Sequence, residues 1–256
     1  MSDFYANYLK VCQDAVDDDL MFKKFKHHTD YTLVLEHVSP SDGINYISEI
    51  RKTYPSLLNH INKFATNDNI GNPNVYPFKE LGLNMSPTTL RYIKVLADLM
   101  NLFGRLDDIN IVEIGVGYGG QCKIIEDIAE PKSYTLIDRH EALLLSEKYL
   151  KHHKAKKIIL READDSSKIH YDLCISNYAF AEIPRAYQNF YAENIIKNSD
   201  MGYMTCNIFG YGDPNEPMTK EDIMSLRQNY NILPEVPLTA VNNIVYTWGA
   251  SNHSII

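Results

Sequence analysis

The stretch IVEIGVGYGG, residues 111–120, decides the fold of this chain. It joins a short apolar run, typical of a buried strand, to a turn in which four of the last six residues are glycine. Glycines there let backbone N–H groups at the start of a helix come close to a ligand, at the point where a parallel strand ends. Gly115, Gly117 and Gly120 match the pattern GxGxxG, which alone is a weak signal for a nucleotide-type cofactor.

Short strand-like runs and helical runs alternate on both sides of this stretch. Upstream, Ser86 and Pro87 are expected to cap a helix that ends before Gly104. Strands are predicted at 110–115, 133–138, 156–160, 171–176 and 202–207, with helices at 120–128, 141–153, 184–198 and 220–229 between and after them. Further strands at 232–239 and 243–248 suggest a closing hairpin. The pattern predicts an α/β fold with a mostly parallel sheet and helices on both faces.

The N-terminal third has a different pattern. Residues 1–67 predict two or three amphipathic helices, one of them from Ile44 to Phe64, which form a cap on the main domain. Residues 67–87 are rich in Asn, Gly and Pro and predict a long ordered loop rather than an element. The expected domains are therefore an N-terminal helical cap with its loop, 1–85, and a cofactor-binding domain, 86–256.

Composition limits the classes of partner. A formal charge of −8 disfavours duplex nucleic acid, which binds through clustered Lys and Arg, and it suits a small or glycan-like substrate better. The four cysteines are scattered without CxxC spacing, as in the reduced core of a cytoplasmic protein. We read no signal peptide and no membrane span. A homo-oligomer is left open.

Acids at the strand ends separate two classes of cofactor. Glu113 lies two places before the first glycine, where it disfavours the pyrophosphate of a dinucleotide and attracts the ammonium and sulfonium of S-adenosylmethionine. Asp138 ends the second predicted strand and is placed to accept hydrogen bonds from both ribose hydroxyls. Either Glu162 or Asp164 is expected to meet the adenine amino group. S-adenosylmethionine is therefore the predicted cofactor, with further contacts from Gly115, Gly117, Tyr118, Gly119, Gln121 and Asn177.

Several blocks resemble a known family. The segments 112–122 (VEIGVGYGGQC), 134–150 (YTLIDRHEALLLSEKYL) and 175–184 (ISNYAFAEIP), with 70–78 and 86–96, are similar to sugar O-methyltransferases of bacterial capsule and surface-glycan gene clusters. These are class I S-adenosylmethionine-dependent methyltransferases. The resemblance implies a Rossmann-like seven-stranded sheet with a reversed final strand, and a sugar hydroxyl as acceptor. Such enzymes suit nucleotide-activated sugars, such as a GDP-linked heptose or deoxysugar. The segment Arg139–Glu141 departs from the family, which often has an apolar or Pro-containing segment there.

The proposed chemistry assigns roles at the carboxyl ends of the strands. Methyl transfer needs alignment above all, and a general base that takes the proton of a weakly acidic hydroxyl adds to it. Glu182 is the first candidate for this base and His140 the second, and Asn177 is expected to contact cofactor or substrate. The predicted substrate-binding residues lie in loops: Tyr76, Tyr178, Asn207 and Tyr211.

The metal content and the function have alternatives that the sequence leaves open. Adjacent His pairs do not share a helix face, so no structural metal is predicted, and a catalytic divalent ion is left undecided. The alternatives are a class I methyltransferase with another small hydroxyl or phosphorylated acceptor, a non-catalytic cofactor-binding partner subunit, and a dinucleotide oxidoreductase.

Overall fold

The computed structural model describes residues 3–165, 167–208 and 216–250, and the chain divides into two compact units. One, here called the sheet unit, comprises Leu102–Gly115, Glu130–Asp138 and the chain from Lys157 on. The other, the helical unit, comprises the chain up to Asn101 with Val116–Ala129 and Arg139–Lys156. Both units are discontinuous in sequence, whereas the predicted domains 1–85 and 86–256 follow chain order; those domains stay a prediction.

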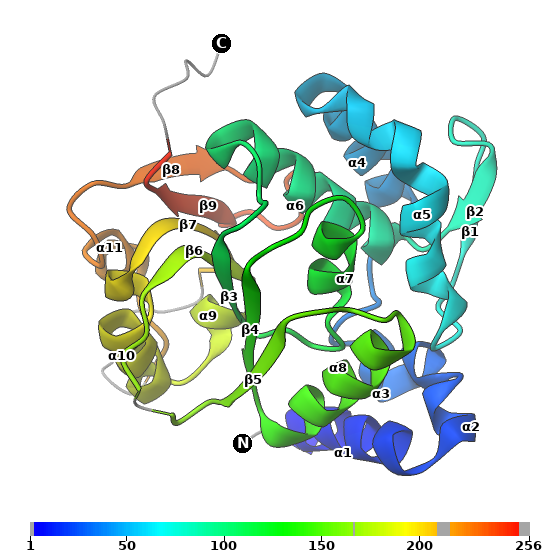
Figure 1. The fold of residues 1–256 in the computed structure, drawn as a ribbon, viewed down its shortest axis with the longest axis horizontal. Helices are drawn as coiled ribbons and strands as arrows, with labels where there is room; N and C mark the ends of the chain where they lie inside the picture. Colours follow the sequence, from blue (N-terminus) through cyan, green and yellow to red (C-terminus); the bar gives the residue numbers. More distant parts are fainter. Residues whose placement is uncertain (1–2, 166, 209–215, 251–256) are drawn as a thin grey trace. The chain divides into compact units, whose positions relative to one another are not determined.

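Seven strands form the sheet of the sheet unit, in the order β5-β4-β3-β6-β7-β9-β8 (Figure 1). β9 (Ile244–Trp248) is antiparallel to both of its neighbours, β7 and the edge strand β8 (Asn231–Pro234). This order confirms the predicted mostly parallel sheet, its reversed final strand and the closing hairpin. The five remaining strands are parallel: β5 (Ile158–Glu162), β4 (Ser133–Asp138), β3 (Asn110–Ile114), β6 (Tyr171–Asn177) and β7 (Ser199–Cys206).

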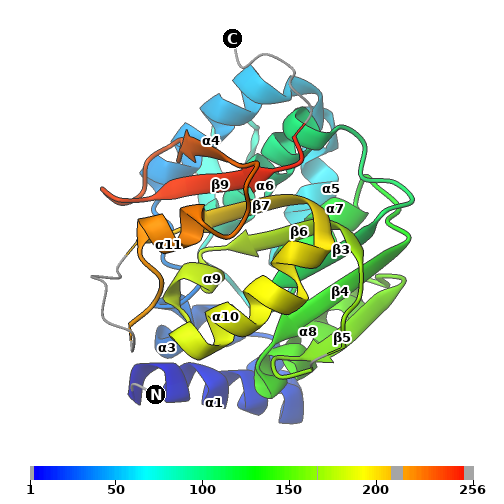
Figure 2. The ribbon, with the colours of Figure 1, turned by 90° about the vertical axis from the view of Figure 1, so that its left-hand side faces the viewer.

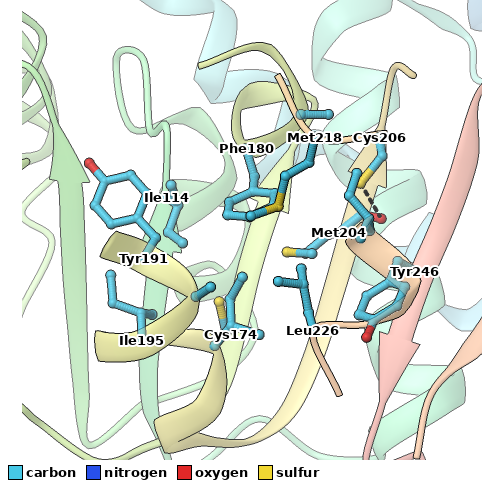
Figure 3. Packing of buried hydrophobic residues seen from close by; sticks show 14 of the residues in the cluster. Ile114, Cys174, Phe180, Tyr191, Ile195, Met204, Cys206, Met218, Leu226 and Tyr246 are labelled. Carbon is cyan, nitrogen blue, oxygen red and sulfur yellow. Dashed lines mark hydrogen bonds between the residues drawn. The ribbon is translucent and has the colours of Figure 1, made fainter. Parts of the chain in front are cut away.

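One face of this sheet is covered by α9 (Ala179–Glu182), α10 (Arg185–Asn194) and α11 (Lys220–Met224), which lie on the same side in both ribbon views (Figure 1, Figure 2). Figure 3 shows Cys174 of β6 and Met204 of β7 meeting Phe180 of α9, Tyr191 of α10 and Leu226 beyond α11. Removal of these apolar surfaces from water holds the helices to the sheet. Helices on the second face and an N-terminal cap stay predictions.

A glycine in β7 makes room for the only tryptophan in the chain. Gly202 pairs with Trp248 of β9, and a Cβ atom on Gly202 would lie 2.1 Å from the indole ring. The indole is 1% exposed, and its Nε1 donates to the carbonyl of Ser199 at 3.0 Å. A side chain at position 202 would displace the ring, which explains a glycine inside this strand.

The helical unit holds most of the helices. Its predicted cap at Ser86 is confirmed: Ser86 Oγ accepts from the N–H of Thr88 at 3.2 Å, and Gly104 follows the helix at φ +81°. No helix within residues 3–165, 167–208 and 216–250 is long and apolar enough to cross a membrane. The elements are α1 (Asp3–Asp17), α2 (Asp19–Phe22), α3 (Thr29–Thr32), α4 (Pro40–Thr53), α5 (Ile61–Ala65), α6 (Pro87–Phe103, whose last two residues begin the sheet unit), α7 (Gly120–Glu126), α8 (His140–His152) and the hairpin of β1 (Tyr76–Phe78) and β2 (Leu83–Met85).

The predicted continuous helix from Ile44 to Phe64 is wrong. α4 ends at Thr53, and Tyr54 takes φ −150° and ψ 68° before Pro55. A proline disfavours helical backbone in the residue before it, so the chain passes through a 3-10 helix, Pro55–His60, before α5 begins. The apolar spacing continues across this break, which is why the periodicity alone did not reveal it.

Three other predicted boundaries also differ from the structure. The segment 67–87, expected to lack elements, contains β1 and β2, whose three residues each are too few for alternation to show. The last helix ends at Met224 rather than at residue 229, where Ser and Asn residues favour turns. The strand expected to reach Thr239 ends at Pro234, because prolines at 234 and 237 cannot donate to a ladder.

The cysteines are buried thiols, as predicted. Cys12, Cys122, Cys174 and Cys206 form no disulfide. Burial in an apolar environment raises the pKa of Cys174 and of Cys206 to about 12. Both groups therefore stay protonated near neutral pH and are poor nucleophiles.

Candidate functional site

Polar residues gather at the carboxyl edge of the sheet, where the parallel strands end. Asp138 ends β4 and pairs with Glu162, the last residue of β5, while Asn177 ends β6. The chain adds β4 and β5 on one side of β3 and then returns to add β6 on its other side. Open α/β sheets bind ligands at the carboxyl edge beside such a switch point, so the ends of β3 and β6 mark the candidate site.

Glu113 is the buried acid of this site. Its side chain is 2% exposed, and Oε2 accepts a hydrogen bond from the Tyr134 hydroxyl at 2.8 Å. Burial raises its pKa from 4.5 to about 8; the Tyr134 hydrogen bond opposes this rise and the charge of Asp138 adds to it. Among the described residues, no cation is one of the groups that shift this pKa. A buried acid in such surroundings is suited to receive a positive charge from a ligand.

Gly115 begins the turn after β3, and both its backbone and its surroundings require glycine. It takes φ +78°, and its N–H donates to the carbonyl of Ile137 at 2.8 Å. A Cβ atom on Gly115 would lie 2.0 Å from the Cβ of Ala179, the first residue of α9. The segments 112–122 and 175–184, which carry most of the family resemblance, therefore meet at this point.

The segment after β6 supplies the second half of the site. Tyr178 has a left-handed backbone, with φ 67°, and its N–H donates to the carbonyl of Thr205 at 2.8 Å. Its hydroxyl donates to Glu235, and the exposed Glu182 accepts a hydrogen bond from Asn207. The structure thus brings predicted catalytic and substrate residues together at the ends of β6 and β7. Asp164, also predicted, is exposed in the turn after β5.

Six predicted site residues belong to the helical unit, and two of them have buried side chains with packing roles. Tyr118 is 0% exposed, its hydroxyl accepts from Asn67 Nδ2 at 3.0 Å, and Lys26 Nζ lies 4.0 Å from its ring centroid. Gln121 is 1% exposed and donates to the carbonyl of Tyr92 at 3.2 Å. Their roles toward a ligand stay predictions, as do those of Gly117, Gly119, His140 and Tyr76. Tyr211 lies outside the described residues.

Glu235 is a residue of this edge that the sequence analysis missed. It directly follows β8 and is 5% exposed, although it is an acid. Because the strand was expected to continue to Thr239, Glu235 counted as an interior strand position. The flanking Pro234 and Pro237 were the signal that would have placed it at a strand end.

Among the described residues, one group of side chains has the arrangement of metal ligands. The ligand atoms of His170, Asp172 and Asp200 lie within 4.8 Å of one another. His170 Nε2 is 3.1 Å from Asp200 Oδ2, and Asp172 Oδ2 accepts from the N–H of Asn110 at 2.6 Å. These contacts by themselves explain why the three side chains lie together. The group lies where β6 and β7 begin, opposite to the carboxyl edge. The expectation of no metal site stays a prediction.

Comparisons with known proteins give similarity of fold only. No family model matches the chain, and no curated protein matches it. The solved structure of the pyocyanin biosynthetic protein PhzM is 12% identical in sequence, with a TM-score of 0.44 over 63% of this chain and 58% of PhzM. An S-adenosylmethionine-dependent methyltransferase from Clostridium acetobutylicum is 11% identical, with a TM-score of 0.46 over 63% of this chain and 90% of that protein. EvdMO1 is 16% identical, with a TM-score of 0.49 over 77% of this chain and 47% of EvdMO1. The chain thus spans about half of EvdMO1. At such scores these likenesses do not indicate an activity.

Proposed function

We propose that this chain is a class I S-adenosylmethionine-dependent methyltransferase that methylates a hydroxyl of a sugar. The proposed acceptor is a nucleotide-activated sugar, such as a GDP-linked heptose or deoxysugar, on the way to capsule or surface polysaccharide. The sugar part of the proposal rests on the sequence resemblance. The cofactor part rests on Glu113, a buried acid at the switch point of the sheet.

The strand order favours this cofactor over a dinucleotide. The first five strands follow the order 3-2-1-4-5 of dinucleotide-binding sheets, but the antiparallel β9 stands where those sheets have a parallel sixth strand. The pyrophosphate of a dinucleotide would also bring negative charge toward Glu113 and Asp138. Both features disfavour the oxidoreductase reading.

The residues of the sheet unit fit S-adenosylmethionine. Glu113 would hold its cationic methionine end, Asp138 its ribose hydroxyls, and the bare backbone of Gly115 would let it come close to the turn. When bound, this cofactor supplies a methyl group on a positively charged sulfur. The half-buried Asp138 and the exposed Glu162 lie side by side at the ends of β4 and β5, where a nucleoside meets both.

The opposite side of the switch point supplies groups for an alcohol. Glu182 is the proposed general base, because it is exposed at the carboxyl edge and its hydrogen bond with Asn207 fixes the direction of its carboxylate. Asn177 adds a polar side chain at the end of β6. These groups would orient the hydroxyl and remove its proton as it attacks.

Isothermal titration tests the cofactor directly. We expect micromolar binding of S-adenosylhomocysteine and no measurable binding of NADH. The reverse result would remove the proposed function. Incubation of the protein and S-adenosylmethionine with a panel of nucleotide sugars, followed by mass spectrometry for a methylated product, tests the acceptor. Cofactor binding with no product from any member would favour a non-catalytic partner subunit or another class of acceptor.

Asp138→Ala is expected to weaken S-adenosylhomocysteine binding at least tenfold. It removes one or two charge-assisted hydrogen bonds to the ribose, each worth roughly 1.5–3 kcal/mol. Titration calorimetry of the variant measures the change, and Asp200→Ala, an exposed acid where β7 begins, serves as the control. An Asp138→Ala protein with wild-type affinity would take this residue out of the site.

Glu182→Gln is expected to keep cofactor affinity and to lower kcat by about a hundredfold, the usual contribution of a general base. The amide can still accept the hydrogen bond from Asn207, so the geometry is preserved. Rates with an accepted nucleotide sugar and titration with S-adenosylhomocysteine measure the two effects. Wild-type turnover would move the base assignment to another residue, with His140 the next candidate.

A further inference from the structure

Tyr178 has a backbone conformation that bulky side chains rarely adopt. Its φ of 67° and ψ of −28° lie in the left-handed region. Its N–H donates to Thr205, and the next residue, Ala179, packs against Gly115. Such conformations persist where the surrounding structure fixes them, and they cluster at functional sites. The backbone around Tyr178 is therefore held by β7 and by the turn after β3.

The side chain of Tyr178 is held by a buried carboxylate. Its hydroxyl donates to Glu235, which also accepts from the N–H and Oγ1 of Thr239 at 2.7 and 2.8 Å and from Asn243 Nδ2 at 3.0 Å. All four donors are neutral groups. Glu235 is 5% exposed, and both of its oxygens accept hydrogen bonds: Oε1 from Tyr178, and Oε2 from Thr239 and Asn243. A glutamine in its place could accept at only one oxygen, so these contacts require a carboxylate.

The charge of Glu235 fixes how Tyr178 can meet a ligand. A tyrosine hydroxyl has one proton, and here that proton is directed to Glu235. Toward a ligand the oxygen can therefore act as a hydrogen-bond acceptor, and the neighbouring negative charge strengthens it in that role. A group that forms a hydrogen bond with the Tyr178 hydroxyl, beside Glu235, must therefore be a donor, such as an alcohol.

We infer that Tyr178 and Glu235 select an acceptor that carries a second hydroxyl beside the one that is methylated. The inference rests on the proposed function. In the transfer, the bond from the acceptor oxygen to the methyl carbon forms, the carbon–sulfur bond breaks with its electron pair left on sulfur, and the proton goes to Glu182. The reacting hydroxyl thus donates to Glu182, so the hydroxyl that donates to Tyr178 is a neighbouring one. Polyhydroxylated acceptors are favoured over single alcohols, because a site built for a hydroxyl rejects an analogue that lacks it.

Tyr178→Phe tests this selection. The substrates are the nucleotide sugar that the wild type methylates best, here the parent, and its analogues that each lack one neighbouring hydroxyl. For the wild type we expect kcat/KM to be about a hundredfold higher with the parent than with one of the analogues. In Tyr178→Phe this preference should fall to about threefold, because KM for the parent rises. The affinity for S-adenosylhomocysteine should not change. An undiminished preference in the variant, or no preference in the wild type, overturns the inference. A wild type that binds S-adenosylhomocysteine but methylates no member of the panel overturns the proposed function, and this inference with it.

Glu235→Gln separates selection from simple support of the loop. If Glu235 acts through Tyr178, the double variant Tyr178→Phe/Glu235→Gln has the same preference as Tyr178→Phe alone. A purely structural role instead predicts that the losses add and that cofactor affinity falls as well. Thr239→Val is the matched control, since it removes one donor to Glu235 and leaves the contact with Tyr178. Its preference for the parent should equal that of the wild type, and a loss as large as in Tyr178→Phe would count against selection by Tyr178 and Glu235.

Discussion

At pH 8, Glu113→Gln is expected to be more stable than the wild type and yet to bind S-adenosylmethionine at least tenfold more weakly. The folded protein raises the pKa of Glu113 from 4.5 to about 8, so the unfolded chain ionises this group at a lower pH. Between these values the unfolded state binds fewer protons than the folded state, and stability falls as pH rises. The cost approaches its full size near pH 8, on the order of 4 kcal/mol. Glutamine does not titrate and avoids this cost.

Urea unfolding of both proteins at pH 5, 6.5 and 8, followed by circular dichroism, measures the free energy of unfolding. We expect similar stability at pH 5, where Glu113 is protonated in the folded state, and a growing advantage of the variant toward pH 8. Titration calorimetry at pH 8 measures the loss of affinity, because the variant lacks the carboxylate that attracts the cationic cofactor. A variant destabilised equally at all three pH values would show that Glu113 supports the fold and is not a strained binding group. An acid kept at a cost to the fold is the pattern of a functional residue.

Gly115→Ala is expected to lower the free energy of unfolding by several kcal/mol and to abolish binding of S-adenosylhomocysteine. The new Cβ would lie 2.0 Å from Ala179 Cβ, so either the turn after β3 or the start of α9 must move. The left-handed backbone adds roughly 1 kcal/mol. The two segments that shift carry Glu113 and Tyr178, so both halves of the proposed site would lose their geometry.

Gly104→Ala is the matched control for this experiment. Gly104 has φ +81°, close to the φ of Gly115, but a Cβ there would meet nothing within 4 Å. The control therefore shows the backbone cost alone, expected at about 1 kcal/mol and without effect on binding. Equal losses in the two variants would mean that the contact between Gly115 and Ala179 does not hold the site together.

The parts of the fold that the sequence predicted are those with strong local signals. The strand 133–138 follows from a run of residues that favour strands, Tyr, Thr, Leu and Ile. The cap at Ser86 follows from the preference of Ser for the position before a helix. The broken helix at Pro55 and the end of β8 at Pro234 were missed, because apolar spacing was given more weight than proline chemistry. The hairpin of β1 and β2 depends on pairing within the folded chain, which three-residue strands do not reveal.

The residues of the candidate site likewise include some that the sequence predicts and some that it does not. Acids at strand ends, such as Glu113 and Asp138, could be named from position alone. The burial of Tyr118 could not, because it depends on Asn67 and Lys26, which are distant in sequence. Glu235 was missed for a related reason: its partner Tyr178 lies 57 positions away, and only the folded chain brings the two together.

The single indole ring of the chain gives the protein a built-in optical reporter. Trp248 lies in β9 against Gly202, inside the sheet unit, whereas buried tyrosines occur in both units, among them Tyr118 in the helical unit and Tyr203 in the sheet unit. Emission excited selectively from tryptophan will therefore follow solvent entry into the sheet unit alone. If part of the tyrosine signal changes at a urea concentration at which the tryptophan signal does not, the helical unit unfolds separately from the sheet unit, and both transitions can be followed without a label.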